Sequence, residues 1–146
     1  MPLDTKASTN QIQYKGLAQG IDVDGFARPV FLEQIVAKTA AYTVLATDAG
    51  ATFTNKGATA SVTFTLPAIA GMLTGWNVWF YQSALQAMVI TAPSGKLIAY
   101  DNAAATSLTC STTSKMGGLR IQITYDGALY MSTVYLANLA QVVTVS

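Results

Sequence analysis

The stretch LRIQITYDGALYMSTVYL, residues 119–136, carries the clearest structural signal in the sequence. Its central dipeptide, Asp126-Gly127, suits a two-residue type I′ turn, because both central positions of that turn need a positive φ. The dipeptide joins residues 119–125 to residues 128–136, so the stretch predicts a β-hairpin. The expected strand pairs are Tyr125 with Ala128, Ile123 with Tyr130, Ile121 with Ser132 and Leu119 with Val134.

The predicted hairpin has two different faces. The face with Leu119, Ile121 and Ile123 is apolar and is expected to join the core, whereas the opposite face mixes apolar and polar side chains. A slip of one residue in the pairing would exchange the two faces. A mixed face suits a contact between subunits better than a contact with water alone, so an oligomer interface is expected there. The candidate residues of this interface are Trp79, Tyr81, Gln122, Leu129, Met131 and Tyr135.

From about residue 41 onward the sequence alternates between strand and turn patterns. Residues 61–66 place Val62 and Phe64 on one face and threonines on the other, and Pro67 ends this run because proline cannot donate a ladder hydrogen bond. Residues 75–81 carry bulky side chains on both faces, which predicts a strand that either lies between two layers or contacts another chain. Further strands are expected at residues 41–45, 52–54, 87–92, 96–100, 107–111 and 142–146, with a loop at residues 101–105.

Short strands at regular spacing predict an all-β domain over residues 37–146, either an antiparallel β-sandwich or a small barrel. Residues 1–36 differ, because their apolar residues follow no strand or helix period for long. A disordered tail is usually poor in aromatic residues, and this segment keeps several, so an extended N-terminal arm that lies on a neighbouring subunit is favoured over a loose terminus. The candidate contact residues of the arm are Tyr14, Ile21, Phe26, Pro29 and Phe31.

The composition restricts the classes of partner. Only 10% of the residues are charged, whereas about 25% is typical of soluble domains. No charged residue lies between Lys56 and Lys96, but proline, glycine and polar residues interrupt this stretch, so it predicts strands rather than a membrane span. The net charge is +1 and the basic residues are scattered, so neither nucleic acid nor membrane is an expected partner. A surface rich in threonine and poor in charge is typical of one covered by other proteins.

The sequence offers little for catalysis. Histidine is absent, which removes the commonest general base and the commonest metal ligand. Asp22 and Asp24 resemble the start of a calcium loop, but the later acidic ligands are missing. The single Cys110 excludes an internal disulfide and is expected to be buried. We therefore expect no catalytic residue, no metal site, no cofactor and no enzymatic activity. The other candidate acids, which are interpreted as turn residues, are Asp48, Asp101 and Asp126.

The series of strand and turn motifs resembles a β module that recurs in the virions of tailed bacteriophages. The motifs that carry this resemblance are AYTVLATDAG at 41–50, NKG at 55–57, SVTFTLP at 61–67, GWNVWFY at 75–81, ITAPSG at 90–95 and YDGALYM at 125–131. The resemblance covers roughly residues 41–136. Modules of this kind occur in capsid decoration (cement) proteins and in tail-fibre or baseplate proteins.

The resemblance implies a capsid decoration protein, because here the module makes up nearly the whole chain. Such a protein, made in the host cytoplasm, would bind the major capsid protein on the surface of the assembled head, as a homotrimer with a terminal arm. The alternative is a tail-fibre or baseplate module that binds a host carbohydrate or receptor. In that alternative, the side chains that would stack on a sugar ring are Trp76, Trp79 and Tyr81.

Overall fold

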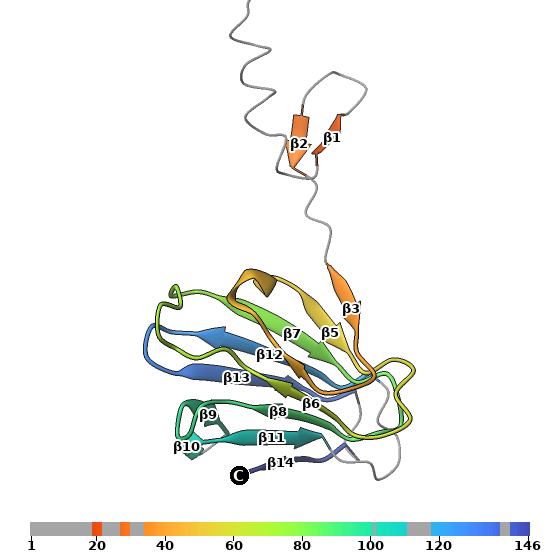
Figure 1. Ribbon diagram of the computed structural model, residues 1–146, viewed down its shortest axis with the longest axis vertical. Coiled ribbons are helices and arrows are strands. Elements are labelled where there is room, and N and C mark those ends of the chain that lie inside the picture. Colours follow the sequence, from red (N-terminus) through yellow and green to blue (C-terminus); the bar gives the residue numbers. More distant parts are fainter. Residues whose placement is uncertain (1–18, 22–26, 30–33, 101, 111–117, 138–140) are drawn as a thin grey trace, which may run out of the picture. The chain divides into compact units, whose positions relative to one another are not determined.

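The computed structural model describes residues 19–21, 27–29, 34–100, 102–110, 118–137 and 141–146 (Figure 1). The chain divides into two compact units, residues 1–33 and residues 34–146. In the first unit, strands β1 (Gln19–Ile21) and β2 (Ala27–Pro29) pair antiparallel, with Ile21 opposite Ala27 and Pro29 opposite Gln19. The other candidate arm residues, Tyr14, Phe26 and Phe31, lie outside the described residues. The arm therefore stays a prediction.

The second unit is built from two β-sheets packed together, as Figure 1 shows, which confirms the predicted all-β sandwich. The seven-stranded sheet contains, in spatial order, β10 (Asn102–Ala105), β9 (Leu97–Ala99), β13 (Tyr130–Tyr135), β12 (Arg120–Tyr125), β7 (Asn77–Tyr81), β5 (Thr52–Thr54) and β3 (Ile35–Ala37). The five-stranded sheet contains β14 (Val143–Val145), β11 (Ser107–Cys110), β8 (Met88–Thr91), β6 (Val62–Thr65) and β4 (Tyr42–Thr43). A single 3₁₀ turn, η1 (Ala46–Asp48), joins β4 to β5. Nowhere in the described part of the chain is there a helix with the length and hydropathy needed to cross a membrane.

Both large sheets are mixed rather than purely antiparallel, which corrects part of the prediction. Strands β3, β5 and β7 run parallel to one another, as do β4, β6 and β8, and β9 runs parallel to β13. The reason is the path of the chain, because the strands from β4 to β9 alternate between the two sheets. Each crossing reverses the direction of the chain, so strands two apart in sequence become parallel neighbours in one sheet.

The hairpin of β12 and β13 has a longer turn than the sequence predicts. Tyr125 pairs with Tyr130, so the loop holds four residues rather than two and the pairing is shifted by two residues. The Asp126 carboxylate accepts hydrogen bonds from the backbone N–H groups of Ala128 (2.8 Å) and Leu129 (2.7 Å). The Asp126 N–H also donates to the Leu129 carbonyl at 3.0 Å. Because side chains alternate along a strand, a shift of two leaves the predicted faces unchanged.

The core lies between the two sheets and consists mainly of every second residue of the strands, whose side chains point inward. Rings from both sheets meet at its centre: Phe64 of β6 lies 5.6 Å from Phe53 of β5 and 5.1 Å from Phe80 of β7, measured between ring centroids. Burial of one such side chain contributes about 1.5–3 kcal/mol. The face of β12 expected to be apolar is buried, which confirms that prediction. Its residues are Ile121, Ile123 and Tyr125, and Leu119, which directly precedes the strand, is buried with them.

Besides β1 and β2, two strands of the second unit lie where the sequence predicts none. Residues 102–105 were expected to form a loop, but they form β10 beside β9, with a register shift between Asn102 and Ala105. Tyr100 precedes this strand with φ of 53°, a left-handed conformation that reverses the chain after β9. Strand β3 includes Ile35 and Val36, which are the last two residues of the range 1–36, and pairs them with Thr52 and Phe53.

Candidate interaction surface

The side of the seven-stranded sheet that faces away from the core carries three rows of side chains, which we call the outer face. Strand register defines the rows, because residues paired across neighbouring strands point to the same side. The first row is Ile35, Thr52, Trp79, Gln122 and Thr133. The second row is Ala37, Thr54, Tyr81, Arg120 and Tyr135. The third row is Asn77, Thr124, Met131 and Ile98.

Five of the six residues predicted for the oligomer interface belong to the outer face, namely Trp79, Tyr81, Gln122, Met131 and Tyr135. The sixth, Leu129, is half-buried in the turn between β12 and β13 and is not part of the three rows. Two large apolar members of the outer face, Ile35 and Ile98, are not among the predicted residues. Ile35 was assigned to the arm, and Ile98 lies on a strand whose partner was not predicted.

The centre of the outer face is an aromatic and cationic cluster. The Arg120 guanidinium carbon lies 4.9 Å from the centroid of the Trp79 ring, within the range of a cation–π interaction. The Tyr135 ring lies 5.7 Å from the same Trp79 ring, so β7 and β13 contact each other across β12. Arg120 is the only charged residue of the three rows. The surface therefore presents ordered, largely uncharged side chains around one fixed positive charge.

Several large apolar side chains of the outer face remain accessible. Ile35 is 68% exposed, Met131 40% and Tyr135 48%, whereas Trp79 and Tyr81 are half-buried against their neighbours. Isolated exposed apolar residues are common on proteins. Here they occur together on one sheet face, and such a grouping marks an interaction site more often than a bare surface does.

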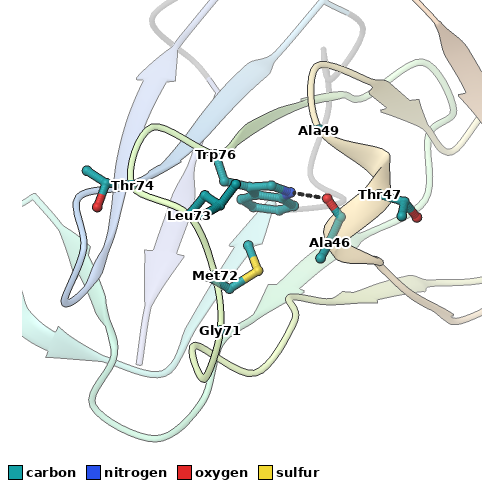
Figure 2. Close-up of a pocket in the computed structure, with 8 residues that line it drawn as sticks. All are labelled: Ala46, Thr47, Ala49, Gly71, Met72, Leu73, Thr74 and Trp76. Atoms are coloured by element: carbon teal, nitrogen blue, oxygen red, sulfur yellow. Dashed lines mark hydrogen bonds between the residues drawn. The ribbon is translucent and has the colours of Figure 1, made fainter. Parts of the chain in front are cut away.

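A hollow lies beside η1 (Figure 2). It has a volume of about 430 Å³ and no ionisable side chain lines it. Trp76 forms one wall, donating its indole N–H to the Ala46 carbonyl at 2.9 Å and packing edge-on against Tyr130. Since Trp76 is buried and its polar group is satisfied by the main chain, its role is structural packing. The residues that line the hollow are Ala46, Thr47, Ala49, Gly71, Met72, Leu73, Thr74 and Trp76.

The described acidic candidates act in turns, as the sequence predicts. The Asp48 carboxylate accepts hydrogen bonds from the Leu45 N–H at 2.8 Å and from the Tyr42 hydroxyl at 3.1 Å. The backbone N–H groups of Leu129 and Ala128 lower the pKa of Asp126, because they stabilise its charged form. Asp22, Asp24 and Asp101 lie outside the described residues.

The thiol of Cys110 is buried, which confirms its predicted position. Burial raises the pKa of Cys110 to about 12, since a thiolate loses its hydration in the core. The thiol is therefore protonated and unreactive at neutral pH. Within the described ranges, no three Cys, Asp or Glu side chains come together in a group that would hold a metal ion.

Comparison of the sequence with the models of known protein families and with curated proteins found no match. The function is therefore inferred from the surface itself.

Proposed function

We propose that this chain is a structural protein of a tailed-bacteriophage virion, a decoration protein that binds the assembled capsid. The motifs that resemble phage β modules support the class. The observation that carries the proposal is the outer face, where exposed Met131 and Tyr135 of β13 lie beside the single charge of Arg120 and exposed Ile35 lies on the edge strand β3 of the same face. Aromatic residues and arginine are enriched at protein interfaces, whereas lysine and the acidic residues are depleted.

In this proposal the outer face forms the contact between copies of the chain in a homotrimer. The cluster of Trp79, Arg120 and Tyr135 has the character of an interface centre, because its rings are ordered by contacts within one subunit before association. Ordering side chains at an interface costs about 0.5–1.5 kcal/mol for each flexible one. A cluster that is already fixed loses less conformational entropy on binding.

Stabilisation of the shell would follow from mass action. A protein that binds the assembled shell but not its separated subunits stabilises the assembly, by about 2.7 kcal/mol at a concentration 100 times the dissociation constant. Contacts made by apolar and hydroxyl side chains depend little on salt, since only charges are screened. The partner in this proposal is the major capsid protein, and residues 1–33 form the arm that reaches it.

The alternative, a tail module that binds carbohydrate, has less support. It relies on three aromatic side chains, and Trp76 is buried with its indole N–H bonded to the main chain. Arg120 lies over the ring of Trp79, so a sugar would have to displace the guanidinium in order to stack there. If the protein binds glycans on an array and Trp79→Ala abolishes that binding, this alternative would be favoured over the decoration protein.

The outer face is tested by the double variant Met131→Glu with Tyr135→Glu. Two carboxylates on this face are expected to prevent association, so light scattering should give the mass of a smaller species, and binding to expanded capsids should weaken at least tenfold. The matched control is Leu85→Glu, which removes an apolar side chain that is 70% exposed in the loop after β7. An unchanged mass for the double variant would contradict the proposed interface.

The arm is tested by a deletion that ends at Glu33. The cut falls there because the Gln34 carbonyl accepts a hydrogen bond from the Thr52 N–H and Ile35–Ala37 pair with β5, so a longer deletion would damage the sheet. The shortened chain is expected to keep its cooperative unfolding transition and to lose most of its affinity for capsids. Capsid binding at the full-length level would rule out the arm as the contact.

A further inference from the structure

The edges of the two large sheets differ in how they are protected against pairing with other strands. An edge strand presents unpaired N–H and C=O groups, and proteins usually guard such edges with lysine, bulges or very short strands. Strand β10 has a register shift between Asn102 and Ala105, and β4 is only two residues long. Lys38 directly follows β3, and its ammonium group lies 3.6 Å from the centroid of the Tyr42 ring in β4. Three of the four edges therefore carry a guard.

The fourth edge, β14, has no such guard among the described residues. Its sequence, Val143-Thr144-Val145, consists of β-branched residues, which favour strands. No Asp, Glu, Lys or Arg follows Asp126 in the sequence, and none occurs in any strand of the five-stranded sheet. Figure 1 shows β14 at the margin of that sheet, and no described strand lies on its other side.

The pairing of β14 with β11 determines which backbone groups point outward. Ser146 and Ser107 exchange two hydrogen bonds, at 2.9 and 3.1 Å. In an antiparallel ladder, hydrogen-bonded pairs alternate with non-bonded pairs, so Thr144 and Thr109 form the next bonded pair. Val143 and Val145 then direct their N–H and C=O groups away from β11. The edge thus offers two donors and two acceptors in one plane.

We propose that β14 pairs antiparallel with β14 of a second copy of this chain, around a two-fold axis at Thr144. Val143 then lies opposite Val145 of the second copy, and the four outward groups of each strand form four backbone hydrogen bonds across the axis. The edge matches itself because its donors and acceptors are symmetric about Thr144 and it carries no charged side chain that would repel its copy. The two five-stranded sheets become one continuous sheet.

The side chains around this edge leave room for a second strand. The side of the five-stranded sheet that faces away from the core carries a row of hydroxyl residues, which are Thr43, Thr65, Thr91, Ser107 and Ser146. Hydroxyls of neighbouring strands in this row hydrogen-bond to each other, as in the 2.6 Å contact between Ser107 and Ser146. Short side chains of this kind do not reach over the edge. Thr144, which lies on the same side of the sheet as Ser146, is exposed at the proposed axis.

This contact is independent of the outer face, because it uses the other sheet and a different edge. It goes beyond the proposed function by joining two copies, or two trimers, through a two-fold axis. Variants of the two surfaces are therefore expected to act separately. Loss of the β14 contact halves the mass of the assembly formed in solution, whether the species that remains is a monomer or a trimer.

The first test is Thr144→Lys in the full chain. Two ammonium groups would face each other across the axis, and like charges directly opposite in a sheet are destabilising. We expect association measured by analytical ultracentrifugation to weaken at least tenfold and the mass to halve, while the thermal midpoint of unfolding stays within a few degrees. The matched control is Thr65→Lys, an exposed position on the same side of the same sheet but on the internal strand β6. An unchanged mass for Thr144→Lys, or an equal loss in Thr65→Lys, would overturn the proposal.

A second test does not depend on weakening the contact. Residues opposite each other in a non-hydrogen-bonded antiparallel pair have Cα atoms about 4.5 Å apart, which is within the range that a disulfide spans. Thr144→Cys is therefore expected to give a covalent dimer on mild oxidation, while the wild type, whose Cys110 is buried, gives none. A Thr144→Cys variant that stays monomeric on denaturing gels after oxidation would refute the two-fold pairing.

Discussion

Replacement of Phe64 with alanine would measure how strongly the two sheets depend on the aromatic centre of the core. Phe64 is fully buried on the five-stranded sheet, and its ring contacts Phe53 and Phe80 on the opposite sheet at 5.6 and 5.1 Å. A buried Phe→Ala change costs about 3–5 kcal/mol, and each aromatic pair adds about 0.5–1.5 kcal/mol beyond area burial. Because two pairs are lost together, we expect the free energy of unfolding to fall by about 5 kcal/mol, at the upper end of this range.

The assay is equilibrium unfolding in urea, followed by tryptophan fluorescence. A typical domain has about 5–15 kcal/mol of stability in total, so the variant should unfold at a much lower urea concentration or be partly unfolded in buffer. Phe64→Leu is the control, because it also loses both ring pairs, at a cost of about 1–3 kcal/mol, but leaves a smaller cavity than alanine does, so its loss of stability should be smaller than that of Phe64→Ala. A loss below about 2 kcal/mol for Phe64→Ala, with an unchanged dependence on urea, would refute the view that these rings hold the sheets together.

Two further predictions concern titration and turn chemistry. Burial raises the pKa of Cys110 from 9.0 to about 12, so the neutral thiol stabilises the fold below pH 9, and this contribution is lost as the pH rises toward 12. Between pH 7 and pH 10, the free energy of unfolding of the wild type, measured in urea, should fall by about 1.4 kcal/mol more than that of Cys110→Ala. Equal losses for the two proteins would contradict the burial argument. Asp126 has a lowered pKa because of the N–H groups of Leu129 and Ala128, so its contribution is present above the pKa of the unfolded chain and disappears as the pH falls through the lower folded value. Asp126→Ala should therefore melt at a lower temperature than the wild type at pH 7, with the two midpoints converging in acid; a difference that stays constant with pH would assign the effect to something other than the carboxylate.

Where a strand alternates clearly between apolar and polar residues, its sequence predicts which side chains face the core. Alternation along residues 62–64 and 119–125 identifies the buried face whatever the partner strand is, and it survives a register error of two residues, as the β12–β13 hairpin shows. The same alternation placed Trp79 and Met131 together on the outer face before any pairing was known.

Features that depend on contacts distant in sequence could not be predicted. No local feature of β4 or β6 indicates that β5, the strand between them in sequence, belongs to the other sheet. The sequence therefore predicts antiparallel strands, whereas β4 and β6 pair in parallel. The length of the turn after Tyr125 depends on how the Asp126 side chain bonds Ala128 and Leu129, whereas the dipeptide alone favours a shorter loop. Ile35 was missed because its strand is ordered by β5 and has no turn signal of its own.

The alternation of strands β4 to β9 between the sheets has a consequence for how the domain forms and comes apart. No two consecutive strands of this segment pair with each other, so each of its ladders closes only after an intervening strand has been placed in the opposite layer. Folds dominated by such non-local pairing cross their transition state slowly, because the entropy of loop closure precedes the gain in contacts. Once folded, neither layer can open without disrupting the other. The stability of the domain would then depend on a slow rate of unfolding as much as on the equilibrium free energy of unfolding.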